Sequence, residues 1–233
     1  MNSKRIQEIG IGLSIIFAFF FLSAYRNDLI NHLRNYDLSN FLINIISGLS
    51  ILVIIAFCML LLRPMLIKNW HDLQKNHHQY FRKYLPYWLI ALGIMMVSNL
   101  ILIFTGDTEI AENEQVIREM FSASPIYIYI SVVIFAPLIE ELVFRGGFFY
   151  LFRNKYVFVL ASGLAFGLVH VLGASSWHQF LFIIPYAIPG FAFALALYET
   201  RNLYVPIAMH FLHNGIVLAL QTFVIFFGNG VIS

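Results

Sequence analysis

Charged residues are scarce in this chain. Only 11% of its 233 residues are Asp, Glu, Lys or Arg, whereas a soluble globular domain usually carries about 25%. The hydrophobic share is 60%, and the mean hydropathy is +0.79. This composition excludes an ordinary water-soluble fold and indicates a polytopic membrane protein that has the lipid bilayer as its main surroundings.

Cysteine, net charge and some familiar motifs are also nearly or wholly absent. Cys58 is the single cysteine and lies in an apolar run, which excludes an intramolecular disulfide. The net charge of +2 gives no reason to expect a nucleic acid partner, because membrane topology accounts for the basic residues. The His-Glu-x-x-His pair of zincins is missing, and no internal repeat is evident.

Long apolar runs dominate what is present. Crossing a hydrocarbon core of about 30 Å takes about 20 residues. Seven runs reach that length, at about 7–25, 41–62, 85–105, 126–152, 156–175, 179–198 and 203–227. We therefore expect an all-α, polytopic membrane helical bundle with seven transmembrane helices. An eighth short or re-entrant helix, within 27–38 or 66–82, is the alternative. Because further runs follow the first, we expect an uncleaved span there and not a signal peptide.

The loops between the runs differ in charge. The loop after the second run is rich in Lys and Arg, and the loop at 106–124 is acidic, with Asp107, Glu109, Glu112, Glu114 and Glu119. Because basic loops stay on the cytoplasmic side, we expect the acidic loop to face outward and the N-terminus to be cytoplasmic. The small size and this charge pattern favour a bacterial plasma membrane protein.

The fourth run holds the ionisable groups at membrane depth. Residues 126–139 carry no charge, and Glu140, Glu141 and Arg145 follow. An ionised group at that depth costs about 2.5–3.5 kcal/mol even on the lenient insertion scale, so such a residue indicates a functional site. Glu141 and Arg145 are four residues apart and can form an ion pair on one helix face. Glu140 is rotated by about 100° and can point elsewhere.

Three further polar groups lie at a similar depth. With a rise of about 1.5 Å per residue, Glu140 lies roughly 18 Å, His170 about 21 Å and Asn214 about 18 Å from the cytoplasmic ends of their runs. On the same scale His210 lies near 12 Å. We therefore expect these four side chains to meet in one layer of the membrane. His213, beside Asn214 on another helix face, is more readily explained by packing.

Local spacing suggests how the helices pack around these groups. Phe166 is four residues before His170 and can pack beside its imidazole. Gly163 and Gly167 form a small-xxx-small pair that allows another helix to approach closely. Pro137 removes a backbone donor just before the carboxylates and is expected to kink or open that helix.

The residue types favour hydrolysis of an amide inside the membrane. A carboxylate in a low-dielectric site can act as a general base toward water, and a nearby imidazole can share the proton. A second imidazole and an amide can donate to the developing oxyanion. Alternatively, Glu140, His170 and His210 can bind Zn²⁺ and leave a fourth position open for water.

Three short motifs resemble those of a known family. Residues 140–145, Glu-Glu-Leu-Val-Phe-Arg, resemble an EExxxR motif. Residues 166–170 resemble an FxxxH motif, and residues 210–214 resemble a His-xxx-Asn motif. In this order, and each on an apolar helix, they are similar to the CPBP intramembrane proteases, also called the Abi or CAAX-protease family. The resemblance covers roughly residues 125–220.

The resemblance implies an integral-membrane endopeptidase in which the first motif glutamate activates water. The implied catalytic residues are Glu140, His170, His210 and Asn214, and the supporting residues are Glu141, Arg145 and Phe166. We expect one integrated membrane domain. It would comprise N-terminal transmembrane helices at 1–124, a catalytic helical core at 125–220, and the end of the last helix with a tail at 221–233.

Cofactor and substrate stay open at this point. Family members are named metalloproteases, but their need for a metal is disputed, and we favour a metal-free glutamate mechanism over zinc. Some members process prenylated CAAX proteins, and bacterial ones are linked to bacteriocin immunity or to maturation of peptide signals. We expect a membrane-associated peptide or protein as substrate.

Two alternatives come from other functional classes. One is a non-catalytic membrane protein that confers immunity or binds peptides with the same cavity. The other is a proton-coupled transporter, because chains of carboxylates and histidines also form proton relays. The absence of repeated halves with paired broken helices speaks against transport.

Overall fold

The computed structural model describes residues 2–36, 38–106 and 110–228, without the side chains of 122, 123 and 224–228. Its helices, in chain order, are α1 (Ser3–Leu33), α2 (Asn40–Thr105), α3 (Glu112–Ala123), α4 (Pro125–Ile130), the π-helical η1 (Ser131–Phe135), α5 (Ala136–Glu140), the π-helical η2 (Glu141–Gly147), α6 (Phe148–Leu151), α7 (Lys155–Val169), α8 (Trp177–Leu181), α9 (Ile183–Thr200) and α10 (Tyr204–Gly228). The described part contains no strand, so the all-α class is confirmed. Asp107, Glu109 and tail residues 229–233 lie outside it.

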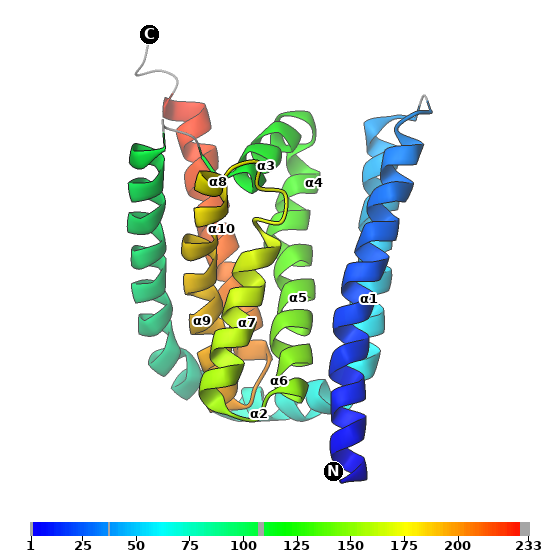
Figure 1. Cartoon of the computed structure of the whole chain (residues 1–233), viewed down its shortest axis with the longest axis vertical. Helices are drawn as coiled ribbons and strands as arrows, with labels where there is room; N and C mark the ends of the chain where they lie inside the picture. Colours follow the sequence, from blue (N-terminus) through cyan, green and yellow to red (C-terminus); the bar gives the residue numbers. More distant parts are fainter. Residues whose placement is uncertain (1, 37, 107–109, 229–233) are drawn as a thin grey trace.

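Helix α2 joins two of the predicted spans. In Figure 1 it descends beside α1, crosses the end of the bundle where the N-terminus lies, and rises on the far side. Pro64 and Pro86 lie inside this helix, and an internal proline kinks a helix because it cannot donate the backbone hydrogen bond. The predicted runs 41–62 and 85–105 are thus two arms of one helix. Residues 66–82 are helical, but as part of α2 and not as a separate helix.

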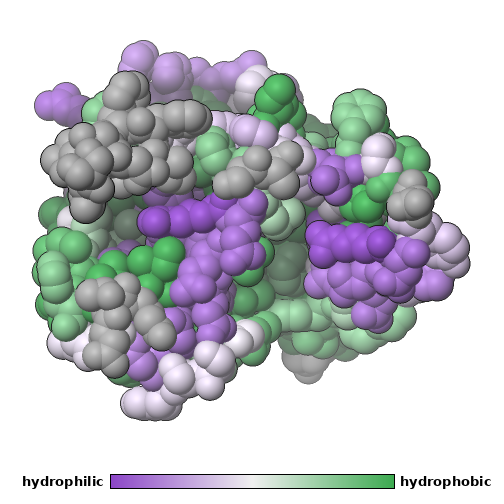
Figure 2. All heavy atoms as spheres, turned by 90° about the horizontal axis from the view of Figure 1, so that it is seen from above, coloured by the Kyte–Doolittle hydropathy of each residue, from purple (hydrophilic) through white to green (hydrophobic). Residues whose placement is uncertain are grey.

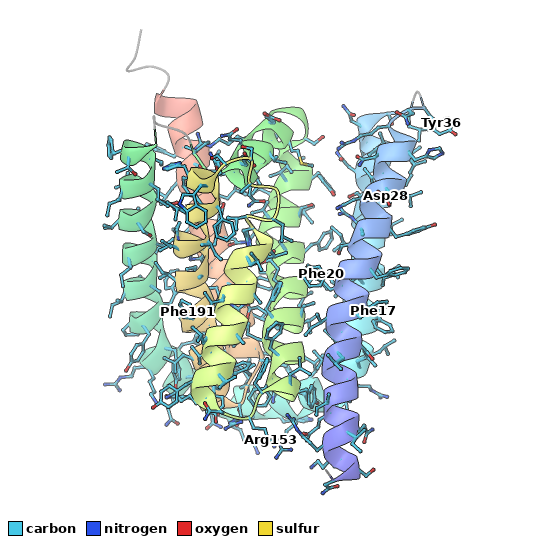
Figure 3. All side chains as sticks on the ribbon, in the orientation of Figure 1. Phe17, Phe20, Asp28, Tyr36, Arg153 and Phe191 are labelled. Carbon is cyan, nitrogen blue, oxygen red and sulfur yellow. The ribbon has the colours of Figure 1, made fainter. Side chains whose placement is uncertain are left out.

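The seven-helix count is not confirmed. Among the residues searched, four helical stretches are long and apolar enough to cross a membrane, namely Ser3–Leu33, Asn40–Thr105, Pro125–Leu151 and Trp177–Thr200. Helix α7 is shorter, since it ends at Val169 and turns follow where the prediction continued the span to 175. Large apolar side chains on these helices are exposed, including Phe17 and Phe20 of α1, as expected for a protein surrounded by lipid (Figure 3).

The prediction that residues 106–124 form a loop is partly wrong, because residues 112–123 form the helix α3. This helix is amphipathic: Phe121 is buried, whereas Glu119 is exposed. It lies over the end of the bundle opposite the N-terminus (Figure 1). Seen from that end, hydrophilic side chains gather over its centre and over the end of α1, while hydrophobic ones surround them (Figure 2).

Most of the basic residues lie at the other end. Figure 3 shows Arg153 there, far from Asp28 and Tyr36. Arg5 donates to the carbonyl oxygens of Tyr150 and Leu151, both at 2.6 Å, and so satisfies the last carbonyls of α6. The charge asymmetry seen in the sequence is therefore an asymmetry of the two ends of the bundle, and its orientation in the membrane stays a prediction.

Two π-helical turns interrupt the helical stretch from α4 to α6. In η1 the amide of Ala136 donates to the carbonyl of Ser131, five residues back. The next amide in that pattern would be that of Pro137, which has no N–H, so the carbonyl of Val132 loses its helical partner. Asn214 of α10 fills the gap, since its Nδ2 donates to Val132 O at 2.8 Å. Pro137 thus leaves a carbonyl of η1 unpaired, and Asn214 joins α10 to η1 by binding that carbonyl.

Close packing of α7 against α9 confirms the role expected for the small-residue pair. A Cβ at Gly167 would lie 2.9 Å from the carbonyl oxygen of Ile183 and 2.9 Å from Ala187 Cβ. A Cβ at Gly163 would lie 2.1 Å from the ring of Phe191. Glycine therefore allows these two helix backbones to approach more closely than any other residue would.

We expect Gly167→Ala to destabilise the fold, because the new methyl group would overlap the backbone of α9. Overpacking of this kind typically costs about 1–3 kcal/mol. The measurement is thermal or denaturant unfolding in detergent micelles. The matched control is Gly93→Ala, inside α2, where a Cβ would meet nothing within 4 Å. Equal stability of the two variants would contradict the close approach.

Candidate active site

The predicted ion pair between Glu141 and Arg145 is present. Arg145 Nε lies 3.1 Å from Glu141 Oε2, and both side chains are completely buried. Arg145 also donates from Nη2 to the carbonyl of Gly190 at 3.0 Å, and its guanidinium lies 4.5 Å from the ring centre of Phe166. The arginine therefore connects η2 to α7 and α9 in the centre of the bundle.

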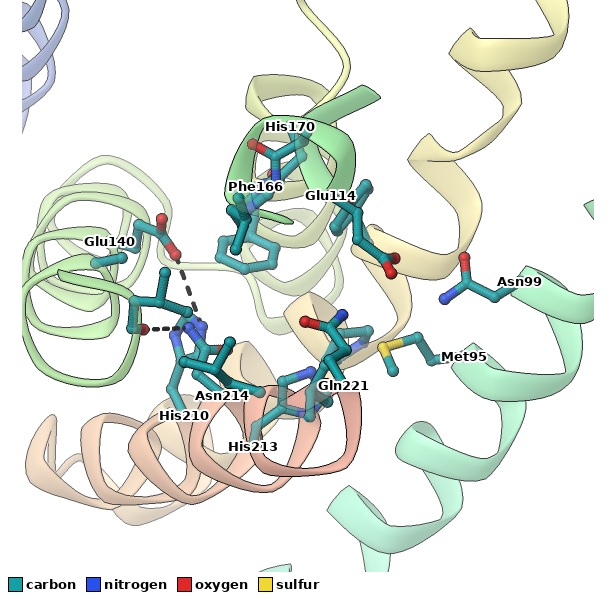
Figure 4. A pocket seen from close by; sticks show the side chains of 18 of the residues that line it. Met95, Asn99, Glu114, Glu140, Phe166, His170, His210, His213, Asn214 and Gln221 are labelled. Carbon is teal, nitrogen blue, oxygen red and sulfur yellow. Dashed lines mark hydrogen bonds and ion pairs between the residues drawn. The ribbon is translucent and has the colours of Figure 1, made fainter. Parts of the chain in front are cut away.

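His210 lies between the two adjacent carboxylates. Its Nδ1 is 2.8 Å from Glu141 Oε1, and its Nε2 is 3.6 Å from Glu140 Oε2 (Figure 4). Because Glu141 is paired with Arg145, its carboxylate is suited to accept a hydrogen bond, which places the His210 proton on Nδ1. The lone pair on Nε2 then faces Glu140. Phe193 stacks on the imidazole at 4.9 Å and holds its plane.

His170 is the C-cap residue of α7. Its Nδ1 lies 2.8 Å from the carbonyl oxygen of Phe166, one turn back. Since a carbonyl only accepts, Nδ1 carries the proton and Nε2 presents a lone pair. The imidazole lies between two rings, with centres 4.7 Å from that of Phe166 and 4.6 Å from that of Tyr186. The expected packing of Phe166 beside His170 is confirmed.

One cavity of about 220 Å³ has all four predicted residues in its lining. They come from three parts of the bundle: Glu140 from α5, His170 from the end of α7, and His210 and Asn214 from α10. In Figure 4 the labelled side chains point inward around this space, with Glu140 and His210 on one side and Asn99 of α2 across from them. The structure thus brings together the residues that the depth estimate grouped.

Other lining residues were not predicted. They come from α2, α3, α9 and α10, and include Met95, Asn99, Asn113, Glu114, Tyr186, Phe193, His213 and Gln221. Most are ordinary polar or aromatic residues whose usual explanation is packing or exposure at a helix end. Only His213 carried a signal, through its position beside Asn214.

Glu140, His170 and His210 are suitable zinc ligands by type, but they are not arranged as a metal site. In the described part of the chain, no group of three or more His, Cys, Asp or Glu is arranged to hold a metal ion. Nδ1 of both His170 and His210 is used in a hydrogen bond, which leaves Nε2 of each as the nitrogen that could bind a metal. The zinc alternative with Glu140, His170 and His210 therefore finds no preformed site among the described residues.

Comparison with known proteins agrees with the motifs. Residues 122–216 match the family model described as type II CAAX prenyl endopeptidase Rce1-like. The chain is 29% identical over 185 residues to the membrane-embedded CAAX protease MroQ of Staphylococcus aureus, covering 73% of this chain and 72% of that protein. It is 33% identical over 114 residues to the putative membrane peptidase YdiL of Bacillus subtilis, covering 48% and 43%. No solved structure matches the chain.

We expect Glu141→Ala to unfold the protein or lower its stability by about 3–5 kcal/mol, because it leaves the Arg145 charge buried without its partner. Unfolding in detergent micelles measures this. The control is Arg153→Ala, which removes the pair with Glu8 at 2.8 Å where the arginine side chain is 67% exposed. That change should cost no more than about 1 kcal/mol. A Glu141→Ala variant as stable as the control would contradict a structural role for the pair.

Proposed function

Because this chain belongs to the CPBP family of membrane proteases, we propose that it is an intramembrane endopeptidase in which Glu140 activates the attacking water. The observation that carries the proposal is the cavity that has Glu140, His170, His210 and Asn214 in its lining, inside a bundle of apolar helices. Burying ionisable groups at membrane depth costs free energy, so their presence there indicates a functional site.

The first step is attack by water on the carbonyl carbon of the substrate. Glu140 accepts one proton of the water, while Nε2 of His170, which presents a lone pair, accepts a hydrogen bond from the other O–H. The water oxygen forms the new bond to carbon, and the carbonyl becomes an oxyanion. Phe166 and Tyr186 hold the imidazole of His170 in the plane that this requires.

The second step uses the pair formed by Glu140 and His210. The proton taken from water passes from Glu140 to His210 Nε2, across a separation of 3.6 Å in the free protein. Glu141 stabilises the resulting imidazolium through its bond to Nδ1. The protonated Nε2 and an N–H of Asn214 then donate to the oxyanion. Collapse of the intermediate breaks the carbon–nitrogen bond, and the proton leaves on the amine product.

The similar proteins indicate a class of substrate and not a particular molecule. The printed names of the relatives, CAAX protease and membrane peptidase, support a membrane-associated peptide or protein as substrate. The family model, with its prenyl endopeptidase description, supports including prenylated peptides among the candidates. We propose a bacterial plasma membrane location with a cytoplasmic N-terminus, where the basic end of the bundle would meet the inner surface.

Glu140→Gln is expected to lower cleavage by at least about 10²-fold while the protein stays folded, because an amide cannot accept the proton of water. The assay is cleavage of a panel of membrane-associated peptides, including a farnesylated CAAX peptide, by purified protein in detergent, with and without a chelator. Glu119→Gln, an exposed carboxylate on α3, is the matched control.

Chelator-insensitive cleavage that is lost in Glu140→Gln would support the metal-free mechanism. Loss of cleavage in chelator, with recovery on adding zinc, would overturn the metal-free part. Unchanged cleavage by Glu140→Gln would overturn the role of this base. If wild type cleaves no peptide of the panel, the non-catalytic peptide-binding alternative takes the place of the proposal.

We expect Asn214→Leu to lower kcat by about 10²–10³-fold with a smaller change in KM, because a donor to the oxyanion acts in the transition state. Steady-state kinetics on the peptide that wild type cleaves best measures both constants. Asn99→Leu is the control, because Asn99 lines the same cavity from α2. A larger loss of kcat in the control than in Asn214→Leu would reverse the assignment.

A further inference from the structure

His213 is a cavity residue that the proposed mechanism does not use. It lies one helical turn from His210 on α10, is only 7% exposed, and forms part of the cavity lining. Its ring centre lies 6.3 Å from that of His210 and 6.0 Å from that of Phe193. A buried imidazole beside the proposed reaction centre needs an explanation in terms of its own hydrogen bonds.

The proton position on His213 is set by Trp88 of α2. The indole Nε1 of Trp88 donates to His213 Nδ1 at 3.2 Å, and both side chains are buried. An indole nitrogen is a donor only, so Nδ1 must present its lone pair, and the neutral imidazole carries its proton on Nε2. This is the reverse of His170 and His210, where Nδ1 faces an acceptor.

The Nε2–H of His213 has no hydrogen-bond acceptor among the residues described. The contact with Trp88 is the one hydrogen bond that the structure records for this side chain. Nε2 is accessible from the cavity and is not one of the fully buried unpaired polar atoms, so a ligand that enters the cavity can supply its acceptor. The most abundant acceptor in a peptide is the backbone carbonyl oxygen.

The position of His213 fits a peptide that extends past the proposed reaction centre. In Figure 4 it is drawn between His210 and Asn214 on one side and Met95 of α2 on the other. An extended chain advances roughly 3.3–3.6 Å per residue. The 6.3 Å between the rings of His210 and His213 therefore matches a carbonyl about two residues from the bond that is cleaved.

We propose that His213 binds a backbone carbonyl of the substrate about two residues from the scissile bond, and that Trp88 is a positioning residue that keeps His213 in its donor form. The inference rests on the proposed peptidase function and adds a subsite to it. This subsite recognises an extended main chain and not a particular side chain. It lies where α10 meets the rising arm of α2.

The first test is the tautomer of His213, which does not depend on activity. Histidine side chains labelled with ¹⁵N distinguish Nε2–H from Nδ1–H in NMR spectra of the protein in micelles, and the signal that disappears in His213→Asn identifies the residue. We expect Nε2–H in wild type and a mixture of tautomers in Trp88→Phe, which keeps an aromatic ring but removes the donor. An Nδ1–H form in wild type would overturn the inference.

The second test separates binding from chemistry. His213→Asn should raise KM about 10-fold on the panel peptide that wild type cleaves best, with kcat within about three-fold, because one hydrogen bond of uniform binding is lost. His213→Gln, whose amide nitrogen can replace Nε2–H, should stay within about three-fold of wild type. Trp88→Phe should raise KM by an intermediate factor.

The outcomes distinguish this inference from the proposed function. If Glu140→Gln is inactive but His213→Asn keeps the wild-type KM, the subsite is wrong and the peptidase stands. If both His213 variants lose kcat equally, the residue has a structural role and the inference fails. If wild type cleaves no peptide, the farnesylated CAAX peptide is titrated against the labelled protein. A shift of the His213 Nε2–H signal would support the subsite, and no shift would overturn it.

Discussion

A buried charge pair organises this molecule. Glu141 and Arg145 lie on consecutive turns of η2 with both side chains completely buried, where either charge alone would be strongly destabilising. The pair extends outward through further contacts. Glu141 orients His210 of α10, and Arg145 binds the carbonyl of Gly190 in α9 and lies over Phe166 of α7. Three helices thus take their positions around one ion pair.

The irregular backbone nearby serves the same arrangement. Pro137 leaves Val132 without a helical partner, and Asn214 supplies one. In the second π-helical turn, Ser162 of α7 donates to the carbonyl of Phe144 at 2.7 Å. Both contacts satisfy a backbone acceptor inside the bundle, where an unpaired carbonyl would be costly. The π-helical turns next to the carboxylates therefore provide the carbonyls through which this helix binds α7 and α10.

The three cavity histidines differ because their neighbours differ. Nδ1 of His170 meets a backbone carbonyl, and that of His210 meets a carboxylate, so both present a lone pair on Nε2. Nδ1 of His213 meets an indole N–H and leaves Nε2 as a donor. One residue type thus offers acceptors and a donor in one cavity. This combination is what the proposed reaction needs, since that reaction takes a proton from water and holds a carbonyl.

The sequence by itself determined the membrane class, the all-α fold, the ion pair and the packing of Phe166 on His170. These follow from composition and from four-residue spacing on a helix, which are local. It also grouped Glu140, His170, His210 and Asn214, whose catalytic roles stay a proposal. The count of seven transmembrane helices is not confirmed, because α2 contains Pro64 and Pro86 without ending at either and so joins two of the predicted spans. The bond from Trp88 to His213 joins residues far apart in the chain, and only tertiary packing brings an indole donor to that imidazole.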